Sequence, residues 1–231
     1  MRKLLYVPII HTEADLGSLA QGIEERAKAV VGDSNWQKHK EVVRLYWQEI
    51  ANYWEGKDVS GLKIFQDGMA GDGVVGKNMV KSLANDGSVN HKIVERLLEK
   101  GAELIKTEDP ELIKEEYFLT RELTERKSDS FRSLSRYKWQ KDRLLKARDT
   151  YIIKRINESL EEGETGVCFL GAYHQIVPVL PEDIEVIALK DPEKVRAYSQ
   201  KYTSKQWESE VSRLGRYLIM PIKPEAGEKN E

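Results

Sequence analysis

Five short apolar segments recur along the chain, and the stretches between them have helical composition and spacing. The first covers residues 3–10, and the others read GLKIFQ, AELIK, TGVCFLG and DIEVIAL. Each has the length of a strand, and strands that alternate with helices are typical of parallel sheets. The sequence therefore predicts an α/β fold with a largely parallel central sheet of about five strands, flanked by helices.

Two helices are expected between the first and second strands. One runs from about residue 16 to residue 31, with Asp15 as its N-cap. The next begins near Ser34 and has one wide apolar face, because apolar side chains recur along it at helical spacing. The members of that face are Trp36, Val43, Trp47, Ile50 and Trp54.

A long, highly charged helical segment at about 110–162 precedes the fourth strand. Asp109 is expected to cap it, a break is expected at KSDS, and Gly163 is expected to end it. We expect residues 1–190 to form a single α/β domain that includes this segment. Residues 191–231 would add a C-terminal helix and a polar tail.

The composition narrows the classes of function. The formal net charge is -2 with mixed signs, so nucleic acid is not an expected partner. No apolar run approaches the roughly 18 residues of a membrane helix, and the first segment lacks the cleavage site of a signal peptide. A single cysteine, Cys168, excludes an internal disulfide and a cysteine-rich zinc site. A cytoplasmic protein is the expectation.

Polar side chains follow the apolar segments at the points where the strands end. His11 follows the first strand, Asp67 the second, Glu108 the third and His174 the fourth. Gly171 permits a sharp turn that aims His174 across the end of its strand. Because ligands bind beyond the carboxyl ends of parallel strands, these groups are expected to converge on one edge of the sheet.

Two imidazoles with one or two carboxylates suit a divalent transition metal such as manganese, cobalt, zinc or iron. We assign His11, Asp67 and His174 as candidate metal ligands. Glu13, or alternatively Asp67, is a candidate general base, and Arg148 is a candidate group for binding an anionic part of the substrate or a developing oxyanion. Without a metal, the two histidines could act as acid and base.

Each histidine also has a structural interpretation. His11 could fix a turn by bonding to the backbone while Asp15 only caps the next helix. His39 lies on the apolar face of the tryptophan-rich helix and is expected to be packed. His91 stands near a helix start and is expected to cap it or face solvent.

The glycine-rich stretch DGMAGDGVVGKN follows the second strand. Gly71, Gly76 and Lys77 match the start of a phosphate-binding P-loop, but Asn78 stands where serine or threonine would hold magnesium. A flexible lid over the sheet edge is the favoured interpretation. We assign Gly71, Lys77 and Gly171 as candidate substrate-binding positions.

The motifs, taken together, resemble the TraB/TIKI superfamily and its ChaN-like and erythromycin-esterase-like relatives. The resemblance rests on His11, the Arg148–Asp149 pair and Gly171 with His174. It implies an α/β fold and a metal-dependent protease or hydrolase. The order of QDG, GSVNH, TEDPEL and GETG also resembles that of uncharacterised prokaryotic proteins, which would form a family of similar architecture.

These observations lead to a metal-dependent hydrolase of a small-molecule or peptide substrate as the first hypothesis. The bond cleaved would be an amide, an ester or a phosphate. The alternative is a non-enzymatic sensor or interaction module that binds a small anion or a nucleotide. A third possibility is self-association through the tryptophan-rich helix, and a homo-oligomer is left open.

Overall fold

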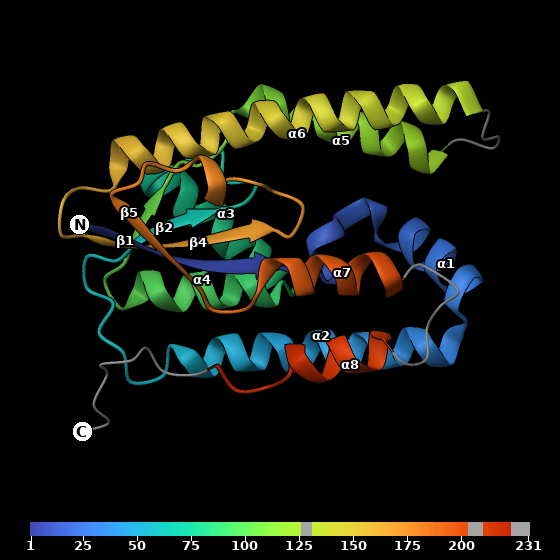
Figure 1. Cartoon of the computed structure of the whole chain (residues 1–231), viewed down its shortest axis with the longest axis horizontal. Coiled ribbons are helices and arrows are strands. Elements are labelled where there is room, and N and C mark those ends of the chain that lie inside the picture. Colours follow the sequence, from blue (N-terminus) through green and yellow to red (C-terminus); the bar gives the residue numbers. More distant parts are fainter. Residues whose placement is uncertain (126–130, 203–209, 223–231) are drawn as a thin grey trace.

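The structure is a computed structural model that describes residues 1–125, 131–202 and 210–222 (Figure 1). Five strands form one sheet in the order β3-β2-β4-β1-β5, and every pairing is parallel. The strands are β1 Arg2–Ile9, β2 Lys63–Gln66, β3 Glu103–Ile105, β4 Thr165–Gly171 and β5 Ile184–Ala188. This confirms the predicted α/β class and the parallel sheet.

Helices cover both faces of the sheet, so the strands are buried on either side (Figure 1). Along β4, Val167 and Phe169 belong to one apolar cluster, while Cys168 and Leu170 belong to the other. This alternation follows from the two-residue repeat of a strand. The helices and short 3-10 segments are η1 Glu13–Leu19, α1 Ala20–Val31, α2 Asp33–Tyr53, α3 Gly73–Asn85, α4 Val89–Glu99, α5 Pro110–Glu125, α6 Phe131–Ser159, η2 Val177–Val179, α7 Pro192–Tyr202 and α8 Glu210–Leu218. In the described part of the chain, none of the helices has the length and apolar composition needed to cross a bilayer.

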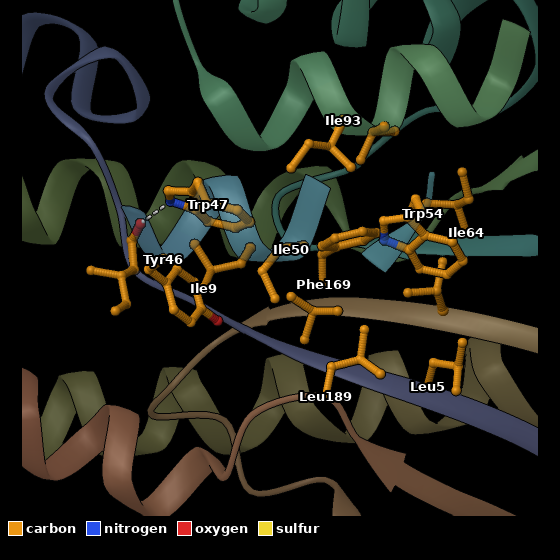
Figure 2. Packing of buried hydrophobic residues seen from close by; sticks show 14 of the residues in the cluster. Leu5, Ile9, Tyr46, Trp47, Ile50, Trp54, Ile64, Ile93, Phe169 and Leu189 are labelled. Carbon is orange, nitrogen blue, oxygen red and sulfur yellow. Dashed lines mark hydrogen bonds between the residues drawn. The ribbon is translucent and has the colours of Figure 1, made fainter. Parts of the chain in front are cut away.

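The tryptophan-rich helix α2 packs against the sheet and fixes the carboxyl end of β1 (Figure 2). Trp47 is fully buried, and its indole nitrogen donates a hydrogen bond to the carbonyl of Ile10 at 3.0 Å. The hydroxyl of Tyr46 donates to the carbonyl of Pro8. The apolar face of α2 therefore lies inside the molecule, and it is not available for self-association.

The start of the α1 region differs from the prediction. Thr12, and not Asp15, is the N-cap, and a 3-10 segment precedes α1. The Asp15 carboxylate accepts hydrogen bonds from the backbone nitrogen of Thr12 at 2.6 Å and from its hydroxyl at 2.8 Å. Asp15 thus stands at the third position of a capping box, which the sequence signal did not separate from the cap itself.

The charged segment forms the pair α5 and α6, which lie side by side over one face of the sheet (Figure 1). Asp109 caps α5, as expected, because its carboxylate accepts from the backbone nitrogen of Glu111 at 2.9 Å. The KSDS stretch and the polar tail lie outside the described residues. The helix α6 ends at Ser159 instead of Gly163, which lies in the turn before β4 with φ 83°.

The C-terminal helices are part of the same core as the sheet. Val195 of α7 and Val211 of α8 pack in the apolar cluster that also contains Val7 of β1. The start of α7 is as expected, because the Asp191 carboxylate accepts from the backbone nitrogen of Glu193 at 2.9 Å.

Candidate functional site

Three neighbouring strands end in a cluster of ionisable side chains. Glu108 follows β3, Asp67 follows β2 and His174 follows β4, so the cluster lies at the carboxyl edge of the sheet. One ligand atom from each residue lies within 4.8 Å of the other two. Glu108 is fully buried, and the side chains of His174 and Asp67 are 4% and 11% exposed. These residues could hold a metal ion.

The backbone positions Asp67 and His174 across the β2–β4 pair. The backbone nitrogen of Gly171 donates to Asp67 Oδ2 at 2.9 Å, and the backbone nitrogen of His174 donates to the carbonyl of Gly171 at 3.0 Å. A Cβ atom at position 171 would lie 3.0 Å from Asp67 Oδ2. Glycine at this position therefore allows the carboxylate and the turn to approach each other.

Arg148 of α6 connects three carboxylates. Its Nη2 lies 2.5 Å from Asp67 Oδ1 and 2.5 Å from Glu108 Oε1, and its Nη1 donates to Glu116 of α5. Its Nε donates to both oxygens of Glu108 at 3.2 Å. The guanidinium is buried and is already bonded to groups of the protein, so its contact with a substrate stays a prediction.

Asp149, the neighbour of Arg148 in α6, holds the imidazole of His174. Its Oδ1 lies 2.5 Å from His174 Nδ1, and its Oδ2 accepts from the backbone nitrogen of Gln175 at 3.0 Å. The other ring nitrogen, Nε2, lies 3.5 Å from Asp67 Oδ2. The imidazole therefore presents Nε2 to the carboxylates at the sheet edge.

The cluster shifts the protonation of its members. Burial opposes the charged imidazolium of His174, but Asp67 and Asp149 outweigh it and raise its pKa to about 10. Burial raises the pKa of Glu108 to about 7, although Arg148 opposes the rise. Burial alone would raise the pKa of Asp67, yet His174 and Arg148 hold it well below its ordinary value.

His11 lies at the same edge but outside the three-residue group. It is exposed, and its Nε2 lies 3.8 Å from the position that a Cβ atom of Gly171 would take. Asp67 Oδ2 and His174 Cδ2 surround that same position at 3.0 and 3.6 Å. The group that could hold a metal thus contains Asp67 and His174 of the expected set, with Glu108 in the place of His11.

Glu13 lies away from this cluster, in an ion pair with Lys40 of α2 at 2.5 Å between Oε1 and Nζ. Both residues line a cavity of about 290 Å³ between η1, α1 and α2. His11 is also part of its lining. Glu13, which the sequence suggested as a general base, therefore lines a neighbouring cavity.

The glycine-rich stretch is helical over much of its length, because α3 begins at Gly73. Gly76 is buried, and a Cβ atom there would lie 2.6 Å from the carbonyl oxygen of Gly71 and 2.8 Å from Leu104. Close packing of α3 against β3 thus explains the glycine at position 76. Lys77 is exposed on α3, and among the described residues it forms no ion pair.

The two remaining histidines have structural contacts. His39 Nδ1 lies 3.0 Å from the hydroxyl of Tyr198, and burial lowers its pKa to about 4. The side chain of Ser88 caps α4, and its hydroxyl lies 2.7 Å from His91 Nδ1. His39 is packed as expected, and His91 lies near a helix start but is buried instead of facing solvent.

Comparison of the chain with protein-family models, with curated proteins and with solved structures gives no significant match.

Proposed function

We propose that the protein is a metal-dependent hydrolase whose divalent ion is held by Asp67, Glu108 and His174. The observation that carries the proposal is the convergence of their three ligand atoms within 4.8 Å at the carboxyl edge of the sheet. One imidazole nitrogen and two carboxylates form a donor set suited to manganese, cobalt, zinc or iron. Fewer than four protein ligands leaves room for a substrate, as in catalytic sites.

The arrangement around His174 supports this assignment. Metal-binding histidines usually donate their second ring N–H to a carboxylate or a carbonyl, which fixes the tautomer and the ring orientation. Asp149 supplies such a carboxylate at 2.5 Å from Nδ1. The ring is thereby directed with Nε2 toward Asp67.

The charge of the site favours a cation over an anion. Carboxylates outnumber the cationic groups with which they pair; the carboxylates are Asp67, Glu108, Glu116 and Asp149, and the cationic groups are Arg148 and His174. An additional anion would enter a site that already carries excess negative charge. This argues against the alternative of a small-anion or nucleotide sensor at this edge.

Hydrolysis adds water across a bond: one product takes the hydroxyl group, and the leaving group takes the remaining proton. A bound ion would supply Lewis acidity toward a carbonyl or phosphoryl oxygen. In the metal-free site burial raises the pKa of Glu108 to about 7, so binding of the ion would displace the proton from this carboxylate. His11, at the exposed rim, would contact the leaving group or the substrate.

The TraB/TIKI-like assignment is part of the proposal, together with a small-molecule or peptide substrate and a cytoplasmic location. The assignment rests on the sequence motifs that contain His11, the Arg148–Asp149 pair, and Gly171 with His174. The buried free thiol of Cys168 is compatible with a reducing compartment.

Metal analysis of protein purified without a histidine tag tests the proposal. Wild-type protein should carry close to one equivalent of a divalent transition metal, and Glu108→Gln should lose it. Glu115→Gln is the matched control, because this α5 carboxylate is about half exposed and pairs with Arg143. A wild-type protein without metal, whose thermal stability does not change on adding manganese, cobalt, zinc or iron, would contradict the proposal.

A further inference from the structure

A cavity of about 290 Å³, open to solvent on one side, lies beside the Asp67–Glu108–His174 cluster between η1, α1, α2 and the start of α4. This volume is near the lower end of the range for small-molecule sites, roughly 300–1,000 Å³. Much of its wall is apolar; the apolar side chains that line it include Leu16, Ile23, Trp36, Val43 and Val89. The proposed hydrolytic chemistry at the sheet edge does not use this cavity.

The charged groups of the wall are compensated within the protein. Lys40 Nζ lies 2.5 Å from Glu13 Oε1 and 3.6 Å from Glu24 Oε1. Glu24 also pairs with Lys28 at 2.8 Å and accepts from the indole of Trp36 at 3.0 Å. Because each of these charges has a partner, the wall offers little to a charged ligand and favours an uncharged one.

Burial keeps the imidazole of His39 neutral at physiological pH, with a pKa of about 4. The part of the cavity wall formed by His39 therefore carries no charge at physiological pH.

His11 connects the cavity with the cluster. His11 is one of the residues that line the cavity. Its Nε2 lies 3.8 Å from the position that a Cβ atom of Gly171 would take, and Asp67 Oδ2 and His174 Cδ2 lie around the same position. A ligand in the cavity would therefore meet the cluster at His11.

We propose that this cavity binds the uncharged apolar part of the substrate, a short alkyl chain or a single ring, and holds the scissile group at His11 beside the metal ligands. This inference rests on the proposed function for the reacting end of the substrate. It adds the substrate class: a neutral apolar group joined to the amide, ester or phosphate that is cleaved.

Three probes separate the two ends of such a substrate: benzyl alcohol for the cavity, acetohydroxamate for the metal, and phenylacetohydroxamate for both. Binding is followed by methyl NMR of Ile23, Val43 and Val89 in metal-free and in zinc-loaded protein. Ile152 and Ile156 of the opposite core cluster serve as the reference. Benzyl alcohol should shift the cavity methyl signals and leave the reference signals unchanged, with or without metal. Phenylacetohydroxamate should bind at least about tenfold more tightly than either simpler probe.

Two variants of α1 test whether the phenyl ring of phenylacetohydroxamate binds in the cavity. Ala20→Phe fills the cavity and should remove the advantage of phenylacetohydroxamate over acetohydroxamate. Ala29→Phe, exposed on the same helix, should keep that advantage. If Ala20→Phe does not fold, Ile23→Ala replaces it: the enlarged cavity should then prefer naphthylmethanol to benzyl alcohol.

The outcomes separate the two proposals. If acetohydroxamate binds only with metal but the phenyl group adds nothing, the cavity inference is overturned and the metal proposal stands. If benzyl alcohol binds in the cavity but neither hydroxamate responds to metal, the proposed function fails, and the substrate inference fails with it. Equal binding of phenylacetohydroxamate by Ala20→Phe and Ala29→Phe also overturns the inference.

Discussion

Asp149 and His174 are joined by a contact of 2.5 Å between Oδ1 and Nδ1, which links the middle of α6 to the turn after β4. This contact leaves Nε2 directed at Asp67. The long charged helix is thereby part of the candidate site, and it supplies Arg148 to the same cluster from the adjacent position.

Replacing Asp149 by asparagine tests whether this contact supports metal binding. We expect Asp149→Asn to lower the affinity for the metal by roughly 10- to 100-fold, since the imidazole loses the carboxylate that fixes its tautomer. Competition with a chelating dye measures the affinity. Asp142→Asn, an exposed position on the same helix, should leave it unchanged. Equal affinities of the two variants would show that Asp149 has no such role.

The stability of the metal-free protein should depend on pH through His174. Its pKa is raised from 6.5 to about 10, so the folded state binds the proton more tightly than the unfolded state. The resulting stabilisation is fully present below pH 6.5 and is lost as the pH rises toward 10. Urea unfolding across this range should show wild type losing on the order of a few kcal/mol more than His174→Gln. If the free energy of unfolding of the two proteins changes equally with pH, the raised pKa of His174 is refuted.

Arg148 should contribute strongly to folding, because its loss leaves buried carboxylates without a partner. We expect Arg148→Met to lower the free energy of unfolding by about 3–5 kcal/mol. Arg143→Met is the control, since the exposed Arg143–Glu115 pair on the same two helices should contribute little. Chemical denaturation measures both. Similar stabilities of the two variants would contradict this prediction, because they would mean that the carboxylates of the cluster do not need Arg148 as a partner.

Gly76 and Gly22 form a matched pair of helical glycines with opposite expectations. A Cβ atom at Gly76 meets the carbonyl of Gly71 at 2.6 Å, whereas at Gly22 there is nothing within 4 Å. Gly76→Ala should therefore lower the stability by about 1–3 kcal/mol through overpacking. Gly22→Ala should be neutral or stabilise by up to about 1 kcal/mol, because alanine is the better helix former. A tolerated Gly76→Ala would contradict the close packing of α3 at this position.

The strands could be predicted from the sequence because they are local apolar runs. The edge at which the polar groups gather could be predicted because the carboxyl ends of parallel strands lie at one edge of a sheet. Glu108 was found as a group at a strand end but not as a candidate ligand. Its neighbours Thr107 and Asp109 are equally polar, and only the fold shows that Thr107 bonds to the backbone of Gln66 while Asp109 caps α5.

Asp149 and Glu13 could not be assigned from local signals. The role of Asp149 depends on how α6 docks on the sheet, and this is fixed by contacts such as that of Ile152 in the apolar cluster. Glu13 follows His11 closely in sequence, but the 3-10 turn of η1 directs it toward Lys40. The glycine-rich stretch suggested flexibility because amino-acid composition alone does not show whether a glycine is closely packed.

Anomalous diffraction at the metal edge, from crystals of wild-type protein grown with zinc or manganese, would locate the ion proposed at Asp67, Glu108 and His174. We predict one strong peak at the carboxyl edge of the sheet, bonded to Asp67, Glu108 and His174 at about 2.0–2.2 Å for zinc. The absence of a peak there, with Arg148 still bonded to both carboxylates at saturating metal, would contradict it.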